Sequence, residues 1–188
     1  MPYCTLTTER LVLRPPKVAD APAIYDGYAR DPDVARYVIW TPHASIAETD
    51  EFLQHFVASA ERDDSYPWVM TLRRERSVIG AMHLRVHRPW AEFGFNIARA
   101  YWNRGFGTES VQGVIEFGLG LPGIERIQAI CHVENEASRR VMEKAGMRLE
   151  GVLRRYLVFP NLGEAAQDVF MYAVTWEDRP ARSPLNRG

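Results

Sequence analysis

The feature that most constrains this chain is residues 101–110, YWNRGFGTES, which join a strand-like run to a helix-like one. Gly105 and Gly107 flank Phe106, so the backbone can turn tightly there and leave N–H groups open. We expect a helix from about Thr108, whose first N–H groups lack intrahelical acceptors at the positive end of the dipole. The segment therefore predicts a site for a phosphate-bearing ligand.

Two familiar phosphate motifs do not fit this segment. A P-loop has Lys and then Ser or Thr after its last glycine, whereas Thr108 and Glu109 stand here. A dinucleotide-binding turn has a third glycine three residues later, where this chain has Ser110. A nucleotide-binding domain stays open, and it predicts that ATP or NAD raises the melting temperature.

Composition indicates a globular protein with one domain over residues 1–178. The 188 residues are 46% hydrophobic and 25% charged, and the formal net charge of -1 argues against a nucleic-acid partner. No apolar run approaches the roughly 20 residues that cross a bilayer, so we expect no membrane partner. Residues 179–188 are rich in Arg and Pro, and we expect a disordered tail there.

The N-terminus lacks a charged-then-apolar secretory pattern, which favours a cytoplasmic location. The two cysteines, Cys4 and Cys131, form neither a disulfide framework nor a zinc site. We therefore expect free thiols in a reducing compartment, with Cys131 buried and inert, and no metal.

The hydrophobic periods predict the element order β-α-α-β-β-β-α-β-α-β-β. Asp20, Ser45 and Asn135 are expected helix N-caps, and Gly146 is expected just past the end of the last helix. A central hairpin followed by β-α-β implies a mixed sheet and an α+β (mixed α/β) class. The strands are expected at 11–14, 66–72, 78–86, 91–97, 126–133, 149–159 and 167–176, and the helices at 21–30, after Ser45, from Thr108 and after Asn135.

Three segments in this order resemble the GCN5-related N-acetyltransferase (GNAT) superfamily, and its RimJ/RimL-type branch most closely. They are residues 9–15 (ERLVLRP), residues 92–109 (EFGFNIARAYWNRGFGTE) and residues 135–151 (NEASRRVMEKAGMRLEG). Together the resemblance runs from about Thr7 to Trp176. It implies a GNAT fold, with a central twisted sheet of about seven strands and about four flanking helices.

The resemblance also implies acetyl-CoA as co-substrate. Backbone N–H groups of the glycine turn are expected to hold its pyrophosphate, and N–H groups near Asn96 and Ile97 to polarise the thioester carbonyl. The expected cofactor-binding residues are Phe95, Asn96, Ile97, Asn103, Arg104, Gly105, Phe106, Gly107, Thr108, Glu109, Asn135 and Ser138.

The chain departs from the superfamily pattern at three positions. Trp102 stands where many members have Gln or Arg, and this change leaves the backbone donors intact. Ser138 stands in the region where many have a Tyr that protonates the leaving thiolate. Leu157 aligns with a Glu that some ribosomal-protein acetylating members use, which argues against a ribosomal-protein acceptor.

Glu92 is the first candidate for the general base and Ser138 for the proton donor. On a strand, Glu92, Gly94 and Asn96 share one face, which places the carboxylate beside the expected thioester. The alternative is that Glu92 pairs with a nearby arginine, and His83 and His132 are then second choices. For Ser138 the alternative is a capping or core contact.

These residues predict an N-acetyltransferase that moves the acetyl group of acetyl-CoA directly to a primary amine through a ternary complex. The acceptor is a protein N-terminus or a small-molecule amine, and the early helices lack the acidic cluster that would favour a polycation. The alternative is a catalytically weak acyl-CoA-binding sensor module. Pairing of two copies, as in other members of the branch, makes a homodimer a further expectation.

Overall fold

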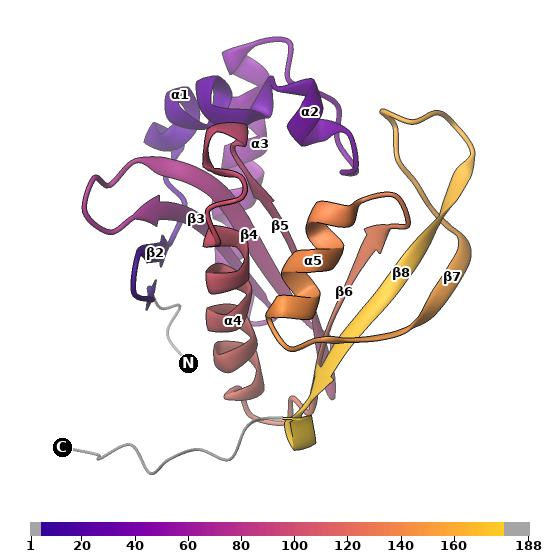
Figure 1. The fold of residues 1–188 in the computed structure, drawn as a ribbon. Coiled ribbons are helices and arrows are strands. Elements are labelled where there is room, and N and C mark those ends of the chain that lie inside the picture. The colour runs from indigo at the N-terminus through magenta and orange to yellow at the C-terminus, as the bar shows by residue number, and fades with distance from the viewer. Residues whose placement is uncertain (1–4, 179–188) are drawn as a thin grey trace, which may run out of the picture.

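The structure is a computed structural model that describes residues 5–178 (Figure 1). Cys4 and the expected tail at 179–188 lie outside the described residues. No helix within 5–178 has the length and apolarity needed to cross a membrane.

One mixed sheet of eight strands organises the described chain, in the order β1-β2-β3-β4-β5-β6-β8-β7. Every neighbouring pair is antiparallel except β5 and β6, which run parallel. This confirms the expected mixed sheet. The strands are β1 (Leu6–Thr7), β2 (Leu11–Arg14), β3 (Ser65–Leu72), β4 (Val78–Val86), β5 (Trp90–Ile97), β6 (Arg126–His132), β7 (Arg148–Val158) and β8 (Ala166–Thr175).

Helices lie on both faces of the sheet (Figure 1). Short 3-10 turns occur at Val18–Asp20, Ser59–Glu61, Arg99–Tyr101 and Trp176–Asp178. The helices are α1 (Ala21–Ile24), which continues as a π-helical turn (Tyr25–Ala29), α2 (Pro32–Ala35), α3 (Ile46–Ala58), α4 (Phe106–Leu119) and α5 (Glu136–Lys144).

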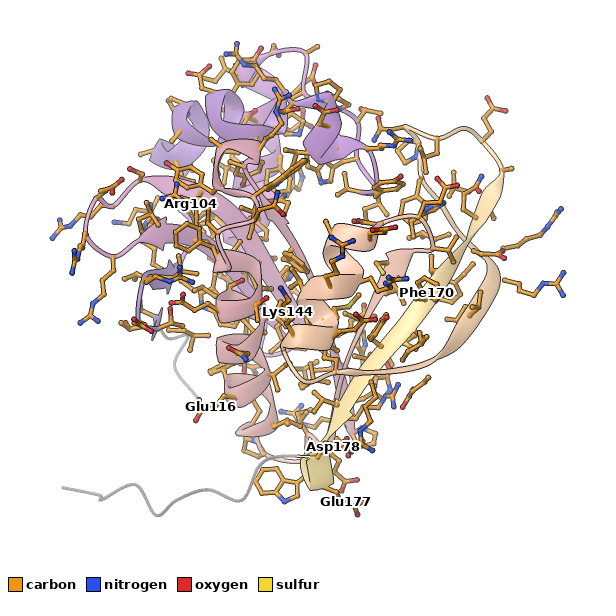
Figure 2. All side chains as sticks on the ribbon, viewed as in Figure 1. Arg104, Glu116, Lys144, Phe170, Glu177 and Asp178 are labelled. Atoms are coloured by element: carbon orange, nitrogen blue, oxygen red, sulfur yellow. The ribbon has the colours of Figure 1, made fainter. Side chains whose placement is uncertain are left out.

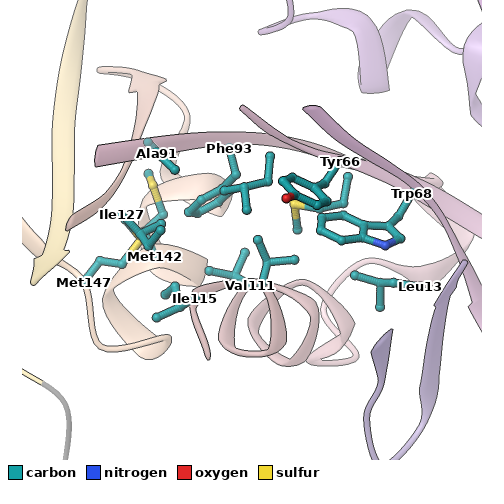
Figure 3. Packing of buried hydrophobic residues seen from close by; sticks show 14 of the residues in the cluster. Leu13, Tyr66, Trp68, Ala91, Phe93, Val111, Ile115, Ile127, Met142 and Met147 are labelled. Carbon is teal, nitrogen blue, oxygen red and sulfur yellow. The ribbon is translucent and has the colours of Figure 1, made fainter. Parts of the chain in front are cut away.

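Two hydrophobic cores hold the layers together. In the larger core, Trp68 and Phe93 of the sheet pack toward Val111 and Ile115 of α4 (Figure 3). In the smaller core, Val69 of β3 meets the α1 and α3 helices on the other face. Because neighbours along a strand point to opposite faces, Trp68 and Val69 direct the two helical layers to opposite sides.

Near the N-terminus the structure differs from the expected elements in three details, and each has an identifiable reason. Asp20 makes no side-chain cap bond, because its carboxylate binds both guanidinium nitrogens of Arg14 at 2.9 and 2.6 Å. The helix expected at 21–30 changes to a π-helical turn at Tyr25. Pro32 starts a further short helix, α2, which the sequence did not predict; Asp31 caps the amide of Asp33, and proline is favoured at the first helical position.

The later helix boundaries follow the sequence more closely. Ser45 and Asn135 are N-caps whose side chains accept from Glu48 N and Ser138 N, and Gly146 has the left-handed φ of 92°. The exception is α4, which begins at Phe106, two residues before the expected Thr108, because Gly105 itself serves as the cap residue.

The parallel pair β5–β6 separates after a short contact. Its register joins only Trp90–Glu92 with Arg126–Gln128, although both strands continue well beyond these residues. The remaining lengths of β5 and β6 therefore diverge. This opening lies in the middle of the sheet, next to the N-terminal ends of α4 and α5.

The main core makes a testable prediction about stability. Leu84 of β4 is fully buried, so Leu84→Ala should lower the free energy of unfolding by about 2–5 kcal/mol, as is typical of core cavities. Ile39→Ala, at a position 63% exposed, is the matched control and should change it little. Urea denaturation measures both, and equal losses in the two variants would contradict this description of the core.

Candidate active site

The turn before α4 is shaped by two residues in the left-handed region. Asn103 has φ 59° and Gly105 has φ 80°. The first bond of the helix runs from Glu109 N to Gly105 O at 3.1 Å. The N–H groups of residues 106–108 precede that bond, so the helix supplies them with no acceptor. They are the donors that the sequence predicted for a phosphate group.

Glu109 has a different place from the one expected, because its own N–H is used within the helix. Its carboxylate accepts from Thr8 Oγ1 at 2.5 Å and from Arg10 N and Nε at 2.7 Å each. Arg10 also donates to the Arg104 carbonyl at 3.0 Å. Glu109 thus joins the turn at residues 103–108, called the phosphate turn below, to β2 and the residues before it. The two segments lie about 100 residues apart, so local sequence patterns do not reveal this contact.

Two guanidinium groups border the turn. Those of Arg10 and Arg104 lie 4.7 and 5.3 Å from the centre of the Phe106 ring. Figure 2 shows Arg104 beside the N-terminal end of α4. The charge of Arg10 is paired with Glu109, so the Arg104 charge and the positive end of the helix dipole are what favour an anionic ligand here.

The turn is also fixed to the end of β5, where the strands diverge. The indole N–H of Trp102 donates to the Ile97 carbonyl at 2.6 Å. A Cβ on Gly107 would lie 3.3 Å from Ile97 Cδ1 and 3.1 Å from Val141 Cγ2. Gly107 therefore permits a close approach of α4 to both β5 and α5, which brings the phosphate turn next to the opening between β5 and β6.

The N-terminus of α5 forms the other border of the opening. Asn135 Oδ1 accepts from Ser138 N at 3.1 Å, so the expected N-cap is confirmed. The Ser138 side chain lies close enough to Cys131 to oppose in part the effect of burial on the pKa of that thiol. Burial raises the pKa of Cys131 to about 11, which keeps this thiol protonated and unreactive at neutral pH.

Glu92 occupies the expected face of β5 but is held by charge partners. Its carboxylate lies 3.1 Å from Arg85 Nε and 3.6 Å from His87 Nε2. The open space beside Gly94, where a Cβ would meet nothing within 4 Å, lies on the same face. The arrangement is that of the alternative expectation, a carboxylate paired with a neighbouring arginine.

The two histidines proposed as second choices are both held in fixed positions. His83 stands opposite Gly94, with Nε2 2.8 Å from Ser65 Oγ, and burial followed by the charges of Arg85 and Arg62 lowers its pKa to about 4. His132 Nδ1 accepts from Glu134 N at 3.1 Å, so Nε2 carries the proton of the neutral ring. His132 is therefore oriented to donate a hydrogen bond rather than to take up a proton.

Aromatic rings gather on the side of the opening that faces α1 and α3. Tyr37 stacks on His132 with the ring centres 5.0 Å apart, and Phe159 meets the same imidazole edge-on at 5.1 Å. Asn161 Nδ2 donates to the carbonyls of Ala35 and Trp40 at 2.6 and 2.8 Å. The β7–β8 loop and the loop after α2 are thereby joined over this side. Local sequence patterns do not reveal this contact, because Asn161 lies 126 and 121 residues from the two carbonyls that it binds.

Comparison with known proteins decides the family. A family model described as an acetyltransferase (GNAT) domain matches residues 10–148. The chain belongs to the GNAT acetyltransferase family. Among curated relatives, YoaA of Bacillus subtilis, an uncharacterised N-acetyltransferase, is 33% identical over 81% of this chain and 87% of its own length. YnaD of the same organism, also an uncharacterised N-acetyltransferase, is 31% identical over 92% of this chain and 98% of its own.

Solved GNAT structures show the same fold. An acetyltransferase from Bacillus anthracis aligns with a TM-score of 0.80 and 26% identity, over 93% of this chain and 99% of its own. RimJ of Mycobacterium smegmatis, determined in complex with CoA-disulfide, gives 0.83 and 23%, over 95% and 90%. The expected GNAT fold and acyltransferase class are thus confirmed, with RimJ among the structural neighbours.

The phosphate turn makes a testable prediction about binding. Gly105→Ala puts a side chain at φ 80° and within 3.2 Å of Arg10 Nη2, so the turn must change shape. We expect acetyl-CoA affinity to fall about tenfold or more, equivalent to at least about 1.4 kcal/mol. Gly123→Ala, at φ 73° with no contact nearer than 3.8 Å, is the matched control for backbone strain. Calorimetry should show unchanged binding for the control, and weakened binding in both variants would contradict a local role for the turn.

Glu109 predicts a pH-dependent stability. Burial alone would raise the pKa of its carboxyl. Hydrogen bonds from Thr8 and Arg10, together with the Arg10 charge, outweigh burial, so the pKa lies below the ordinary 4.5. A depressed folded-state pKa stabilises the protein fully above about pH 4.5, and this stability is lost as the pH falls through the folded value. Urea denaturation of Glu109→Gln should therefore differ most from wild type at neutral pH and least in acid. Glu164→Gln, at an exposed carboxylate, should show no such convergence.

Proposed function

We propose that this GNAT protein transfers the acetyl group of acetyl-CoA directly to a primary amine within a ternary complex. The observation that carries the proposal is the position of the phosphate turn. Its free N–H groups at 106–108 adjoin the opening between β5 and β6, with Gly107 packed against Ile97. A ligand anchored there by a diphosphate can extend its acyl end into the middle of the sheet.

The residues of the site fit acetyl-CoA in charge and shape. The helix N-terminus with Arg104 suits the pyrophosphate, and the Asn135 amide nitrogen suits the amide groups of the pantetheine arm. Acetyl-CoA supplies an activated thioester. Within residues 5–178, no three His, Cys, Asp or Glu side chains are placed to share a metal ion.

The chain itself supplies orientation and proton handling. Ala98 N donates to β4, so by alternation Asn96 N also points to β4, and the N–H of Ile97 points to the edge of β5 that has lost its β6 partner. The Ile97 N–H can therefore donate to a developing oxyanion. The Ser138 hydroxyl, fixed at the first turn of α5, can donate a hydrogen bond to the leaving sulfur. Exclusion of water by the aromatic side of the opening strengthens both interactions.

The acceptor side of the opening favours a compact amine. Tyr37, His132 and Phe159 supply apolar and aromatic surface, and the Asn161 bridge narrows the approach. A small amine with an apolar body, or the first residues of an unfolded protein N-terminus, matches this surface better than a polycation does.

The proposal predicts acetyl-CoA binding together with amine-dependent release of thiol. A useful panel contains benzylamine, spermidine and a short peptide with a free N-terminus. Ser138→Ala should lower kcat by about tenfold to a hundredfold and leave the dissociation constant for acetyl-CoA unchanged. Ser77→Ala, in the β3–β4 turn, is the control.

Three outcomes of this experiment carry different meanings. Binding without thiol release from any amine would favour the sensor module over the enzyme. Absence of calorimetric heat with acetyl-CoA would contradict both. A Ser138→Ala variant with the wild-type kcat would leave the transfer reaction standing and remove Ser138 from it.

A further inference from the structure

A small cavity lies on the acceptor side of the sheet, between β5 and the N-terminal helices. Its lining is mostly apolar and includes three polar side chains, those of Tyr28, His43 and Asn96. The space suits a group of about the size of one water molecule, which requires two to four polar partners. The remaining lining residues are Ile24, Ala29, Trp40 and Phe52.

Tyr28 is the group that marks the cavity as a built site. The residue is 2% exposed, and its buried hydroxyl has no hydrogen-bond partner among the described residues. Burial, followed by the charge of Asp20, raises the pKa of this phenol, so the hydroxyl stays protonated. A buried hydroxyl without a partner is costly, and a water in the cavity would satisfy it.

Asn96 links the cavity to the expected position of the thioester. Its Oδ1 accepts from Ala81 N at 3.0 Å, which fixes the side chain against β4. Its Nδ2 remains as a donor at the cavity lining. The next residue is Ile97, where β5 has diverged from β6. A water held by Tyr28 and Asn96 is therefore adjacent to the place where the amine must attack.

His43 is fixed with one nitrogen free for the cavity. Its backbone N–H donates to Ala29 O at 2.9 Å, and its Nδ1 lies 2.8 Å from the buried Thr49 Oγ1. The ring centres of Trp40 and Phe52 lie 5.6 and 5.9 Å from that of the imidazole. In the tautomer whose Nδ1–H donates to Thr49 Oγ1, Nε2 carries the lone pair that can accept a proton.

The titratable groups around His43 leave it neutral at physiological pH. Burial lowers the pKa of the imidazole below the ordinary 6.5, and the carboxylate of Glu48 on α3 opposes this shift only in part. From the π-helical turn, the protonated Tyr28 phenol lines the same cavity, and the Tyr25 hydroxyl donates to the Ala44 carbonyl. A neutral imidazole has the free lone pair that a base requires.

We propose that His43 is the general base of the acetyl transfer, and that a water held by Tyr28 and Asn96 connects it to the acceptor amine. This assignment rests on the proposed function. An N–H bond of the acceptor ammonium breaks and its electron pair stays on nitrogen. The proton passes to the water as the water gives one to His43 Nε2. Attack by the neutral amine then forms the C–N bond and breaks the thioester C–S bond, whose electron pair leaves on sulfur. The extra proton on the acylated nitrogen passes to the departing thiolate, which gives the amide and the free thiol, and His43 releases its proton to solvent.

The competing bases are less well placed. Glu92 is paired with Arg85, and the Nε2 of His83 is turned to Ser65 of β3, away from the opening. His132 already carries its proton on the nitrogen that is free of Glu134 N. None of these three lines the cavity that contains the unpartnered phenol.

The kinetic experiment uses the full chain with acetyl-CoA and the amine of the panel that releases thiol fastest. His43→Gln should lower kcat about a hundredfold with the KM for acetyl-CoA unchanged, and should abolish the fall in kcat/KM below about pH 6.5 that protonation of His43 causes. Added imidazole should restore part of the activity of His43→Ala. His55→Gln, at an exposed histidine of α3, is the matched control.

The assignment would be overturned if the fall in kcat/KM at low pH disappeared in Glu92→Gln or His83→Gln but remained in His43→Gln. Failure of every amine to release thiol would refute the enzyme itself, whereas release that survives His43→Gln at the wild-type rate would refute only the role of His43. The two failures are therefore distinguishable.

The water has tests that do not depend on turnover. If it satisfies the hydroxyl, Tyr28→Phe should lower the free energy of unfolding, because a water loses a partner in a buried site. A neutral or stabilising effect would indicate an orphaned hydroxyl and overturn the relay. A high-resolution crystal structure with acetyl-CoA should show the water between Tyr28 Oη and Asn96 Nδ2, and a dry cavity would also overturn it.

Discussion

The divergence of β5 from β6 is the constraint on which the rest of the site depends. The two parallel strands pair only at Trp90–Glu92 and Arg126–Gln128. Beyond this contact each strand keeps its other neighbour, β4 or β8, so the sheet remains intact while its middle opens. An opening of this kind exposes backbone donors inside a protein without leaving an unprotected sheet edge. The glycine turn, the α5 cap and the aromatic loop are all arranged around it.

The sequence predicted the parts of the fold that local rules control. Helix caps at Ser45 and Asn135 follow from side chains that bond two or three residues ahead, and the strands follow from alternation. Asp20 has the same capping chemistry, yet Arg14 takes its carboxylate into a buried ion pair. Asp20 therefore stands at the predicted N-cap position of α1 without a side-chain cap bond, because its carboxylate is taken by Arg14.

The same distinction separates the two halves of the candidate site. The phosphate turn is a local feature, so its glycines were readable in the sequence, although the start of α4 was misplaced by two residues. The choice of a base depends on which side chains from distant elements meet. Glu92 had the right strand and face, but its partner Arg85 comes from β4. The sequence did not predict a role for His43, because no local pattern shows that His43, Tyr28 and Asn96 line one cavity.

The two hydrogen bonds of Asn161 make the loop at residues 35–40 and the β7–β8 turn move together on the proposed acceptor side of the opening. The side-chain nitrogen of Asn161 donates to the carbonyls of Ala35 and Trp40, at the two ends of one loop. This loop and the β7–β8 turn therefore cannot separate without losing both hydrogen bonds. At about 1 kcal/mol net for each bond, parted conformations are held to a few per cent of the population. If the proposed acceptor passes between this loop and the β7–β8 turn, its entry and the release of product would require the same opening, and the rate of that opening would limit turnover.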